Sequence, residues 1–308
     1  MRVLALVPGG IERQLEFLPV LHQIKQGLRA AEVSVVADPQ VKSAYGLIPV
    51  ATEVIPYNFR ASNSPADWAN LLGILRDREY EAVITLTESW SLGLLLWLSG
   101  IPTRIGYPGG GNGLLLTATV PHQPDQPYQG LLDALHLSGP LSSLNLSLTQ
   151  ADLTAAEGLR QQAGLRQGYV AVYPGPTANG DTYPTASWVT ILKDFQQRQP
   201  DLPLVLLQTP EARAEIAAIQ ASLPNLIVIT PDGLGQLAAL IAGANLLVAV
   251  NSYPLLLAQA LQVYAVGLNS DTRPTALPSS DRLILLTASP NRLAEINPDA
   301  VLAKIWSE

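Results

Sequence analysis

The chain of 308 residues contains no cysteine and few basic residues, and each absence excludes a class of site. Without cysteine there is no disulfide, no thiolate nucleophile and no cysteine-ligated metal, a composition that suits a cytoplasmic protein. The 18 lysines and arginines against 25 acidic residues give a formal net charge of −7. No basic cluster could follow a phosphate backbone, so nucleic acid is not expected as a partner.

Long hydrophobic runs are also absent. The N-terminus has only five apolar residues, Val3 to Val7, before Pro8. The most hydrophobic segment, Leu92 to Leu98, is far shorter than the about 20 residues that a membrane-spanning helix needs. We therefore expect no membrane span and no signal-peptide core. The first run is instead predicted to be a buried strand, and the second a buried helix that ends at Gly100.

Short β-branched or leucine-rich runs alternate with helical patterns, which is typical of parallel sheets covered by helices on both faces. In the first half, strands are predicted near 2–7, 32–37, 53–56, 82–87 and 103–106. In the second half, they are predicted near 169–173, 203–208, 226–230, 245–250 and 264–268. The length allows two cores of about 150 residues. We expect an α/β protein of two Rossmann-like domains, 1–150 and 151–308, facing a cleft with ligands at the carboxyl ends of strands.

The helical patterns give local predictions. An apolar face over residues 11–28 predicts a first helix, which Pro19 should kink. Thr154 and Glu157 have the spacing of a capping box for a helix that stops at Gly164. Asn297 followed by Pro298 is typical of a helix start, and this last helix could pack back across the first domain.

Five segments resemble glycosyltransferase family 9, the ADP-heptose:lipopolysaccharide heptosyltransferases, in their order and spacing. They are residues 18–21, 100–107, 115–121, 170–175 and 237–248. The resemblance implies a GT-B fold, with a nucleotide-sugar on the second domain and a glycan or lipid-linked acceptor on the first. It also implies inverting transfer without a cofactor, in which a base activates the acceptor hydroxyl and positive charge stabilises the departing diphosphate.

The first departure from the family pattern lies at the position of the base. When Leu18–Pro19 is aligned with the family, Arg13 stands where the family typically has aspartate, and arginine cannot accept a proton near neutral pH. Glu12 and Glu16, on either side of Arg13, are the candidate replacement bases. The alternative is that these three residues form an ordinary solvated helix face.

The second and third departures lie at the donor positions. Asp181 stands where the family usually has lysine, although the neighbouring Tyr183–Pro184 and Trp188 match. A carboxylate facing a diphosphate would repel it unless a divalent cation intervened, and a single aspartate does not make a metal site. Asn251, Tyr253 and Leu256 replace an acid, a glycine and a histidine, while Ser252 is retained.

The resulting donor-side candidates share a place directly after predicted strands. They are Gly175, Thr177, Asn179, Asp181, Asn251, Ser252 and Tyr253. The loop from Gly175 could hold phosphate or ribose oxygens or be a plain surface loop. Ser252 could bind phosphate or only cap a helix, and Tyr253 would place a ring where a diphosphate needs open space.

Two further features carry no site prediction. The glycine-rich segment Pro108–Gly113 does not have the spacing of a dinucleotide fingerprint, and could close over an acceptor or serve as a mobile connector. His22, His122 and His136 do not have the spacing of metal ligands, so no metal site is predicted.

The sequence therefore leaves two functions open. One is a glycosyltransferase that uses Glu12 or Glu16 as its base. The other is a catalytically silent fold that binds a ligand or a protein partner, because three replacements at the base and donor positions would each remove several kcal/mol of transition-state stabilisation.

Overall fold

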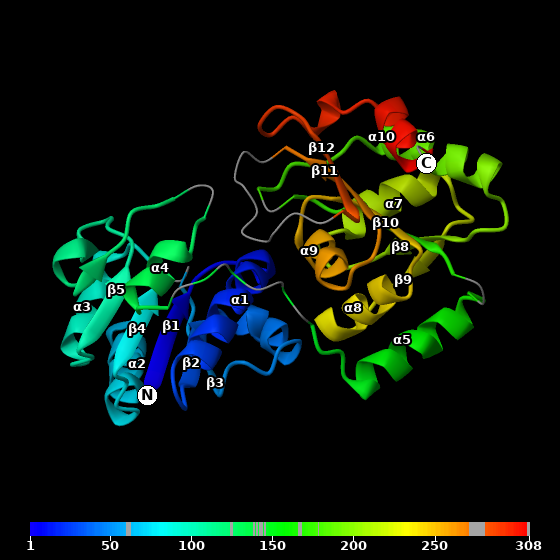
Figure 1. Ribbon diagram of the computed structural model, residues 1–308. Coiled ribbons are helices and arrows are strands. Elements are labelled where there is room, and N and C mark those ends of the chain that lie inside the picture. The colour runs from blue at the N-terminus through cyan, green and yellow to red at the C-terminus, as the bar shows by residue number, and fades with distance from the viewer. Residues whose placement is uncertain are drawn as a thin grey trace. The chain divides into compact units, whose positions relative to one another are not determined.

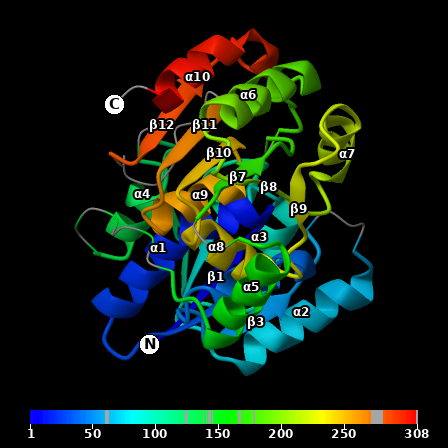
Figure 2. The same ribbon diagram turned by 90° about the vertical axis from the view of Figure 1, so that its right-hand side faces the viewer.

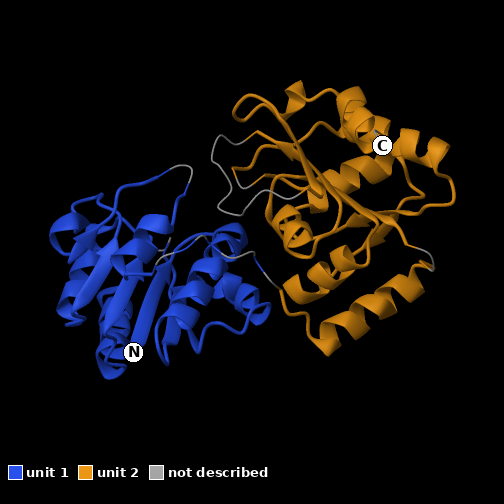
Figure 3. Cartoon of the chain, viewed as in Figure 1, with its two compact units in different colours: residues 1–144, 274–278 blue, residues 145–273, 279–308 orange. Residues whose placement is uncertain are grey.

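The computed structural model describes residues 1–59, 63–123, 126–137, 139, 141, 144, 146–165, 168–177, 179–270 and 281–306. Within these ranges the chain divides into two compact units, shown in blue and orange in Figure 3. Unit 1 contains Met1–Leu144, and unit 2 contains Asn145–Arg273 and Ser279–Glu308. Each unit is built around its own parallel sheet.

The sheet of unit 1 has the strand order β3-β2-β1-β4-β5-β6 (Figure 1). Its strands are β1 (Arg2–Val7), β2 (Glu32–Ala37), β3 (Glu53–Pro56), β4 (Ala82–Thr85), β5 (Thr103–Gly106) and β6 (Ala118–Thr119). All neighbouring strands pair in parallel. β1 and β4 are buried along almost their whole length, as expected for central strands covered on both faces.

Helices cover both faces of this sheet. The helical elements of unit 1 are α1 (Ile11–Gly27), η1 (Pro39–Gly46), α2 (Pro65–Asp77), α3 (Trp90–Leu98), η2 (Asn112–Leu114) and α4 (Gln129–Ala134). Leu4 and Val83 of the sheet pack with Leu71 of α2 and Leu95 of α3 in one apolar core. α1 contains Pro19 as a buried residue and continues to Gly27.

The sheet of unit 2 has the order β12-β11-β10-β7-β8-β9, and Figure 2 shows its strands in this sequence. The strands are β7 (Val170–Tyr173), β8 (Leu204–Leu207), β9 (Ile227–Ile229), β10 (Leu246–Val250), β11 (Ala265–Asn269) and β12 (Leu283–Thr287). They too pair in parallel. The two units therefore repeat one architecture.

The helices of unit 2 form two layers. They are α5 (Gln150–Gln162), α6 (Thr185–Arg198), α7 (Arg213–Ser222), α8 (Leu234–Ala242), α9 (Tyr253–Ala260), η3 (Leu293–Glu295) and α10 (Pro298–Trp306). Contacts join α5, α8 and α9 on one face of the sheet and α7, α6 and α10 on the other (Figures 1 and 2). Trp188 of α6 is fully buried, with Tyr183 edge-on at 5.4 Å.

The predicted fold class is confirmed, because two parallel sheets carry helices on both faces. Each of the ten predicted strands is present, but β6 and β12 are not predicted. β6 is only two residues long, and three of the five side chains of β12, an edge strand, are exposed. None of the described helices is long and apolar enough to cross a membrane.

The predicted capping box at the start of α5 is wrong. Thr149 is the N-cap, and its hydroxyl accepts a hydrogen bond from the Asp152 N–H at 3.1 Å. Thr154 lies inside the helix, where its hydroxyl donates to the carbonyl of Gln150. Both threonines are followed three residues later by an acid, so the sequence pattern alone favours neither.

The last helix begins at Pro298 as predicted, and the Asn297 side chain accepts from the Asp299 N–H at 2.9 Å. Within unit 2 it packs on α6, where the Trp306 indole donates to Asp194 at 2.8 Å. Packing of this helix on the first domain stays a prediction.

Candidate functional site

In unit 2 the strand order reverses between β7 and β10, which are hydrogen-bonded neighbours. Ala249 of β10 pairs with Tyr173 of β7, so both strands end at the same edge. The loop containing Gly175 to Asp181 leaves β7 there, and the turn Asn251–Tyr253 leaves β10. In open α/β sheets ligands bind at such a switch point. All seven predicted donor-side residues thus follow two adjacent strands.

The loop after β7 is folded on itself by hydrogen bonds. The Thr177 N–H donates to the carbonyl of Asp181 at 2.8 Å, and the Asp181 N–H donates to the Thr177 hydroxyl at 3.0 Å. Gly175 is buried, and a side chain there would meet the Tyr173 ring. Asn179 is exposed near the tip. The loop is therefore a compact turn that presents Asn179 to solvent.

Asp181 has a structural role that its sequence position does not reveal. Its Oδ2 accepts a hydrogen bond from the Ser270 hydroxyl at 2.7 Å and another from the Leu293 N–H at 2.9 Å. Ser270 follows β11 and Leu293 begins η3, so the carboxylate joins three segments of unit 2. Among the described residues, no group of three or more His, Asp or Glu is arranged to hold a metal ion.

The turn after β10 is tied to the neighbouring strands through carboxamides. The Asn251 side chain donates to Asn269 Oδ1 at 2.9 Å, and the Asn269 side chain donates to the Thr287 hydroxyl at 3.5 Å. Ser252 occupies the N-cap position of α9, but its side chain makes no capping bond. Its hydroxyl instead donates weakly to the carbonyl of Val250 at 3.4 Å. The turn keeps the strand-to-helix geometry with the serine hydroxyl directed back to the strand.

Tyr253 fills part of this edge of unit 2. The residue is only 7% exposed, and its ring lies edge-on to Tyr173 with 6.0 Å between the centroids. Its hydroxyl donates to Glu211 at 3.4 Å, and the Tyr173 hydroxyl lies 3.2 Å from that of Thr209. Burial, followed by the neighbouring Tyr173, raises the pKa of Tyr253 well above its ordinary value. Two buried aromatic rings therefore occupy space beside β7 and β8.

Unit 1 has its own switch point, between β1 and β4. A pocket of about 620 Å³ opens there. Pro8 after β1 and Thr87 and Glu88 after β4 line it, together with the aromatic residues Tyr57, Phe59 and Trp68. The pocket thus combines aromatic walls with a carboxylate at the carboxyl ends of the strands.

The predicted base region of α1 is joined to α4. The Arg13 guanidinium donates to the Tyr128 hydroxyl at 3.1 Å, and that hydroxyl donates to Glu16 at 3.4 Å. Burial lowers the pKa of Arg13, but Tyr128 and Glu16 outweigh it, so that the pKa is raised. Burial raises the pKa of Tyr128 to about 12 against the opposing effect of Arg13. Arg13 and Glu16 are brought together, while Glu12 lies half-buried in the first turn.

Glu88 and His122 are site residues that the sequence analysis does not identify. The His122 Nε2 lies 2.8 Å from Glu88 Oε1, and the imidazole stacks on Tyr107 at 3.9 Å between centroids. The only sequence signal was the position of Glu88, among polar residues directly after a buried strand. The pairing with His122, 34 residues later, has no sequence signature.

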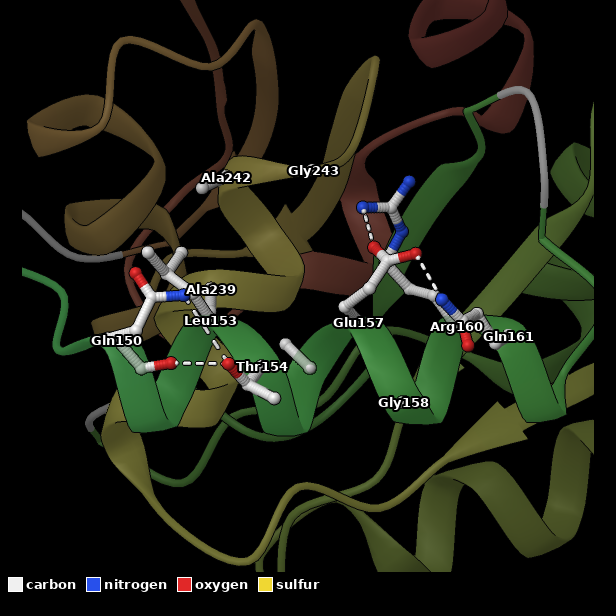
Figure 4. A pocket seen from close by; sticks show the side chains of 11 residues that line it. Gln150, Leu153, Thr154, Glu157, Gly158, Arg160, Gln161, Ala239, Ala242 and Gly243 are labelled. Atoms are coloured by element: carbon white, nitrogen blue, oxygen red, sulfur yellow. Dashed lines mark hydrogen bonds and ion pairs between the residues drawn. The ribbon is translucent and has the colours of Figure 1, made fainter.

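A second hollow of about 640 Å³ lies between α5 and α8 (Figure 4). Its charged groups are bonded to one another, since Glu157 accepts from Arg160 at 3.0 Å and from Gln161 at 3.1 Å. The hollow lies on a helix layer and not at the carboxyl ends of the strands. The polar side chains in this hollow therefore stabilise the surface of α5 by bonding to one another.

Two Rossmann-like units, each with loops gathered at the switch point of a parallel sheet, define the GT-B class of glycosyltransferase folds. A family model for glycosyltransferase family 9 (heptosyltransferase) matches residues 68–296. The chain belongs to this family, and the resemblance seen in the sequence is confirmed.

Solved structures show the same fold at low sequence identity. Escherichia coli ADP-heptose lipopolysaccharide heptosyltransferase II is 18% identical, with a TM-score of 0.81 and coverage of 99% of this chain and 97% of that one. A family 9 glycosyltransferase from Veillonella parvula is 16% identical, with a TM-score of 0.83 and coverage of 98% and 95%. E. coli heptosyltransferase WaaC with ADP-2-deoxy-2-fluoro heptose is 18% identical, with a TM-score of 0.75 and coverage of 99% of both chains. No curated protein matches the sequence.

Proposed function

We propose that this protein is an inverting glycosyltransferase that moves a sugar from a nucleotide-sugar donor to a glycan or lipid-linked acceptor. The observation that carries the proposal is the family 9 match over residues 68–296, which includes segments of both units. A solved relative, E. coli WaaC, was determined with an ADP-sugar analogue. An ADP-sugar is therefore the first donor to test.

In this proposal the donor binds at the switch point of unit 2. Asn179 is exposed in the loop after β7, and Asn251 is partly exposed in the turn after β10. Both carboxamides can hydrogen-bond to ribose or phosphate oxygens. The inward Tyr253 ring and the hydrogen-bonded Asp181 carboxylate restrict the diphosphate to the outer part of this edge.

The acceptor binds in the 620 Å³ pocket of unit 1. Aromatic side chains such as Tyr57 and Trp68 present flat apolar faces, and the ring C–H groups of a sugar can pack against these while its hydroxyls bond to polar neighbours. On α1, Glu16 shares the Tyr128 hydroxyl with Arg13, so a role as base would have to compete with these contacts. Glu12 and Glu16 both stay candidate bases on α1.

A second function has specific support in two side chains. Arg13 and Asp181 stand at the family's base and lysine positions, and each is held by hydrogen bonds within its own unit. Such contacts favour a catalytically silent fold that has kept these positions for stability. This protein would then bind a nucleotide-sugar without transferring it, or bind a protein partner.

Calorimetric titration with ADP-, GDP- and UDP-sugars tests the donor site. We expect saturable binding of at least one donor, weakened by Asn251→Ala and unchanged in Thr190→Ala, an exposed control on α6. Nucleoside diphosphate release that depends on an added acceptor then separates transfer from silent binding. If no donor in the panel binds, the transferase proposal is wrong; binding without transfer to any acceptor supports the silent fold.

A further inference from the structure

We propose that Glu88 is the general base of the transfer reaction and that His122 orients its carboxylate. This inference rests on the proposed glycosyltransferase function. It assigns the base to the residues after β4, in a family member whose helix α1 carries Arg13 at the position of the expected acid.

Glu88 follows β4, the strand next to β1 in the sheet. β1 and β4 are neighbours, with Leu6 paired to Thr85, and the Leu86 N–H donates to the carbonyl of Leu6 at 3.0 Å. The chain after β4 therefore leaves the sheet beside the chain after β1. Glu88 and Pro8 line the same pocket as a result. A carboxylate at Glu88 consequently reaches the pocket beside the loop that leads into α1.

The glycine-rich segment 108–113 packs closely against Glu88. A Cβ on Gly109 would lie 2.1 Å from Glu88 Oε2, so the carboxylate occupies the space that any other residue would fill. Asn112 is almost completely buried, accepts from the Gly109 N–H at 3.1 Å and donates to the carbonyl of Thr87 at 3.0 Å. This segment is thus a fitted support for the Glu88 side chain.

The Glu88 carboxylate has His122 as its side-chain partner. Because a carboxylate only accepts, His122 must carry its proton on Nε2 to donate to Glu88 Oε1 across 2.8 Å. The imidazole stacks on Tyr107, which is buried and donates its hydroxyl to the carbonyl of Pro127. His122 is therefore held in place by Tyr107, and it fixes one oxygen of a carboxylate whose residue lines the pocket. We assign His122 as a positioning residue.

In the proposed step, the Glu88 carboxylate takes the proton of an acceptor hydroxyl as the acceptor oxygen attacks the anomeric carbon of the donor. The new bond from oxygen to the anomeric carbon forms on the face opposite the departing group. The bond from the anomeric carbon to the diphosphate oxygen breaks, and the nucleoside diphosphate leaves with that electron pair. The proton remains on Glu88 until product release, when it passes to solvent.

The main experiment compares carboxylates in the full-length protein. ADP-, GDP- and UDP-sugars are paired with glucose, N-acetylglucosamine, maltotriose and octyl glucoside, and nucleoside diphosphate release is measured. Loss of a general base is expected to lower kcat by about 10²-fold or more, so Glu88→Gln should show this loss with KM little changed. Glu12→Gln and Glu16→Gln should lose far less. Glu32→Gln is the matched control, because Glu32 is exposed, pairs with Arg2 and lies at the amino end of β2, away from the carboxyl ends of the strands.

Chemical rescue separates catalysis from folding. Glu88→Ala should regain transfer when formate is added, because formate can take the place of the missing carboxylate, whereas a purely structural role would not respond. His122→Ala should lower kcat, and His122→Gln should restore part of it, because the glutamine amide can still donate to Glu88. Circular dichroism and thermal unfolding of each variant identify any that fail to fold.

The results of these experiments distinguish the assignment of Glu88 as the base from the proposed function on which that assignment rests. Transfer by the unsubstituted protein that is lost in Glu88→Gln and rescued by formate in Glu88→Ala supports the base. Transfer that survives Glu88→Gln, or that is lost instead in Glu12→Gln, overturns the base alone. No acceptor-dependent release by the unsubstituted protein with any pair overturns the proposed function, and the base with it.

Discussion

The two units contain the same sheet, but their switch points differ in what stands beside them. In unit 1, Pro8–Gly9–Gly10 follows β1, and an aromatic-walled pocket of about 620 Å³ opens at the ends of β1 and β4. In unit 2, the buried rings of Tyr173 and Tyr253 lie at the ends of β7 and β10. Parallel topology therefore determines where a ligand can bind, and the side chains in the first turns determine whether there is room for it.

The difference also separates two kinds of polar residue. Glu88 in unit 1 lines a pocket and faces open space, with 46% of its side chain exposed. Asp181 in unit 2 accepts two hydrogen bonds at one oxygen from segments of its own unit. A carboxylate at the end of a strand can therefore hold a fold together or remain accessible to a ligand, and its neighbours decide which.

The largest expected effect tests the filled edge of unit 2. Tyr253→Ala removes a buried ring and should lower the free energy of unfolding by about 3–5 kcal/mol, as large aromatic truncations do. Tyr253→Phe keeps the ring and loses the polar contacts of the hydroxyl, including the long hydrogen bond to Glu211, so it should cost only about 0.5–1.5 kcal/mol. Urea unfolding measures both. A loss below that of Tyr253→Phe in the alanine variant would show that the ring is not packed as described.

Removal of the Tyr253 ring should also open space at the switch point of unit 2, as there is at the switch point of unit 1. If space limits donor binding, Tyr253→Ala should bind ADP more tightly than Tyr253→Phe does, in spite of its lower stability. Calorimetry at a temperature where both variants are folded makes this comparison.

A smaller effect is expected from one buried tyrosine in each unit, through the loss of stability at alkaline pH. Burial raises the pKa of Tyr128 in unit 1 and of Tyr169 in unit 2 to about 12, from an ordinary value of 10.0. Between these values the unfolded chain binds fewer protons than the folded one, so stability falls as pH rises. Below pH 10 each tyrosine contributes its full stabilisation, which is lost as the pH rises through about 12. The raised pKa corresponds to about 2–3 kcal/mol of unfolding free energy for each tyrosine, at about 1.36 kcal/mol per pKa unit.

Unfolding measured in urea from neutral pH to the alkaline limit checks this prediction. Tyr128→Phe and Tyr169→Phe should each flatten the decline, because the ionising hydroxyl is gone. A decline that is identical in both variants and in the unsubstituted protein would assign the alkaline response to other groups.

The smallest effect concerns the support of Glu88 in unit 1. Gly110 has φ +52°, and a Cβ there would lie 2.2 Å from the Glu88 carbonyl oxygen. Gly110→Ala should therefore cost about 1–3 kcal/mol through backbone strain and displacement of Glu88. Gly113→Ala is the matched control, because its nearest neighbours are 3.8 Å away. Thermal unfolding and amide hydrogen exchange at residues 86–89 measure the difference; equal effects in the two variants would contradict the proposed support.

Much of the fold could be predicted because its signals are local. Buried parallel strands are short apolar runs, and the ten predicted strands correspond to β1–β5 and β7–β11 within one or two residues at most ends. β12 is missed although it contains Leu283–Leu286, because the sequence before it, with Pro274 and Pro278, has no helical apolar periodicity that would predict a crossover. The capping box at α5 was predicted at the wrong threonine because Thr149 and Thr154 have equivalent sequence signals five residues apart.

The candidate site was less predictable because its contacts join distant parts of the chain. The sequence identified Arg13 and Asp181 as departures, but their partners Tyr128 and Ser270 lie 115 and 89 residues away. The direction of a side chain also cannot be read from its position, as Ser252 shows, since its hydroxyl returns to Val250 instead of capping α9.

The fit of Glu88 against Gly109 also constrains how this family member can change. Three atoms of Glu88, namely Oε2, Cδ and Cβ, would lie 2.1–2.9 Å from a Cβ at position 109, so the two positions cannot vary independently. Alanine at 109 should be harmful beside any residue at 88 that has a Cβ, because the Glu88 Cβ itself would lie 2.9 Å from the added atom. A directed-evolution library at position 88 should therefore keep glycine at 109.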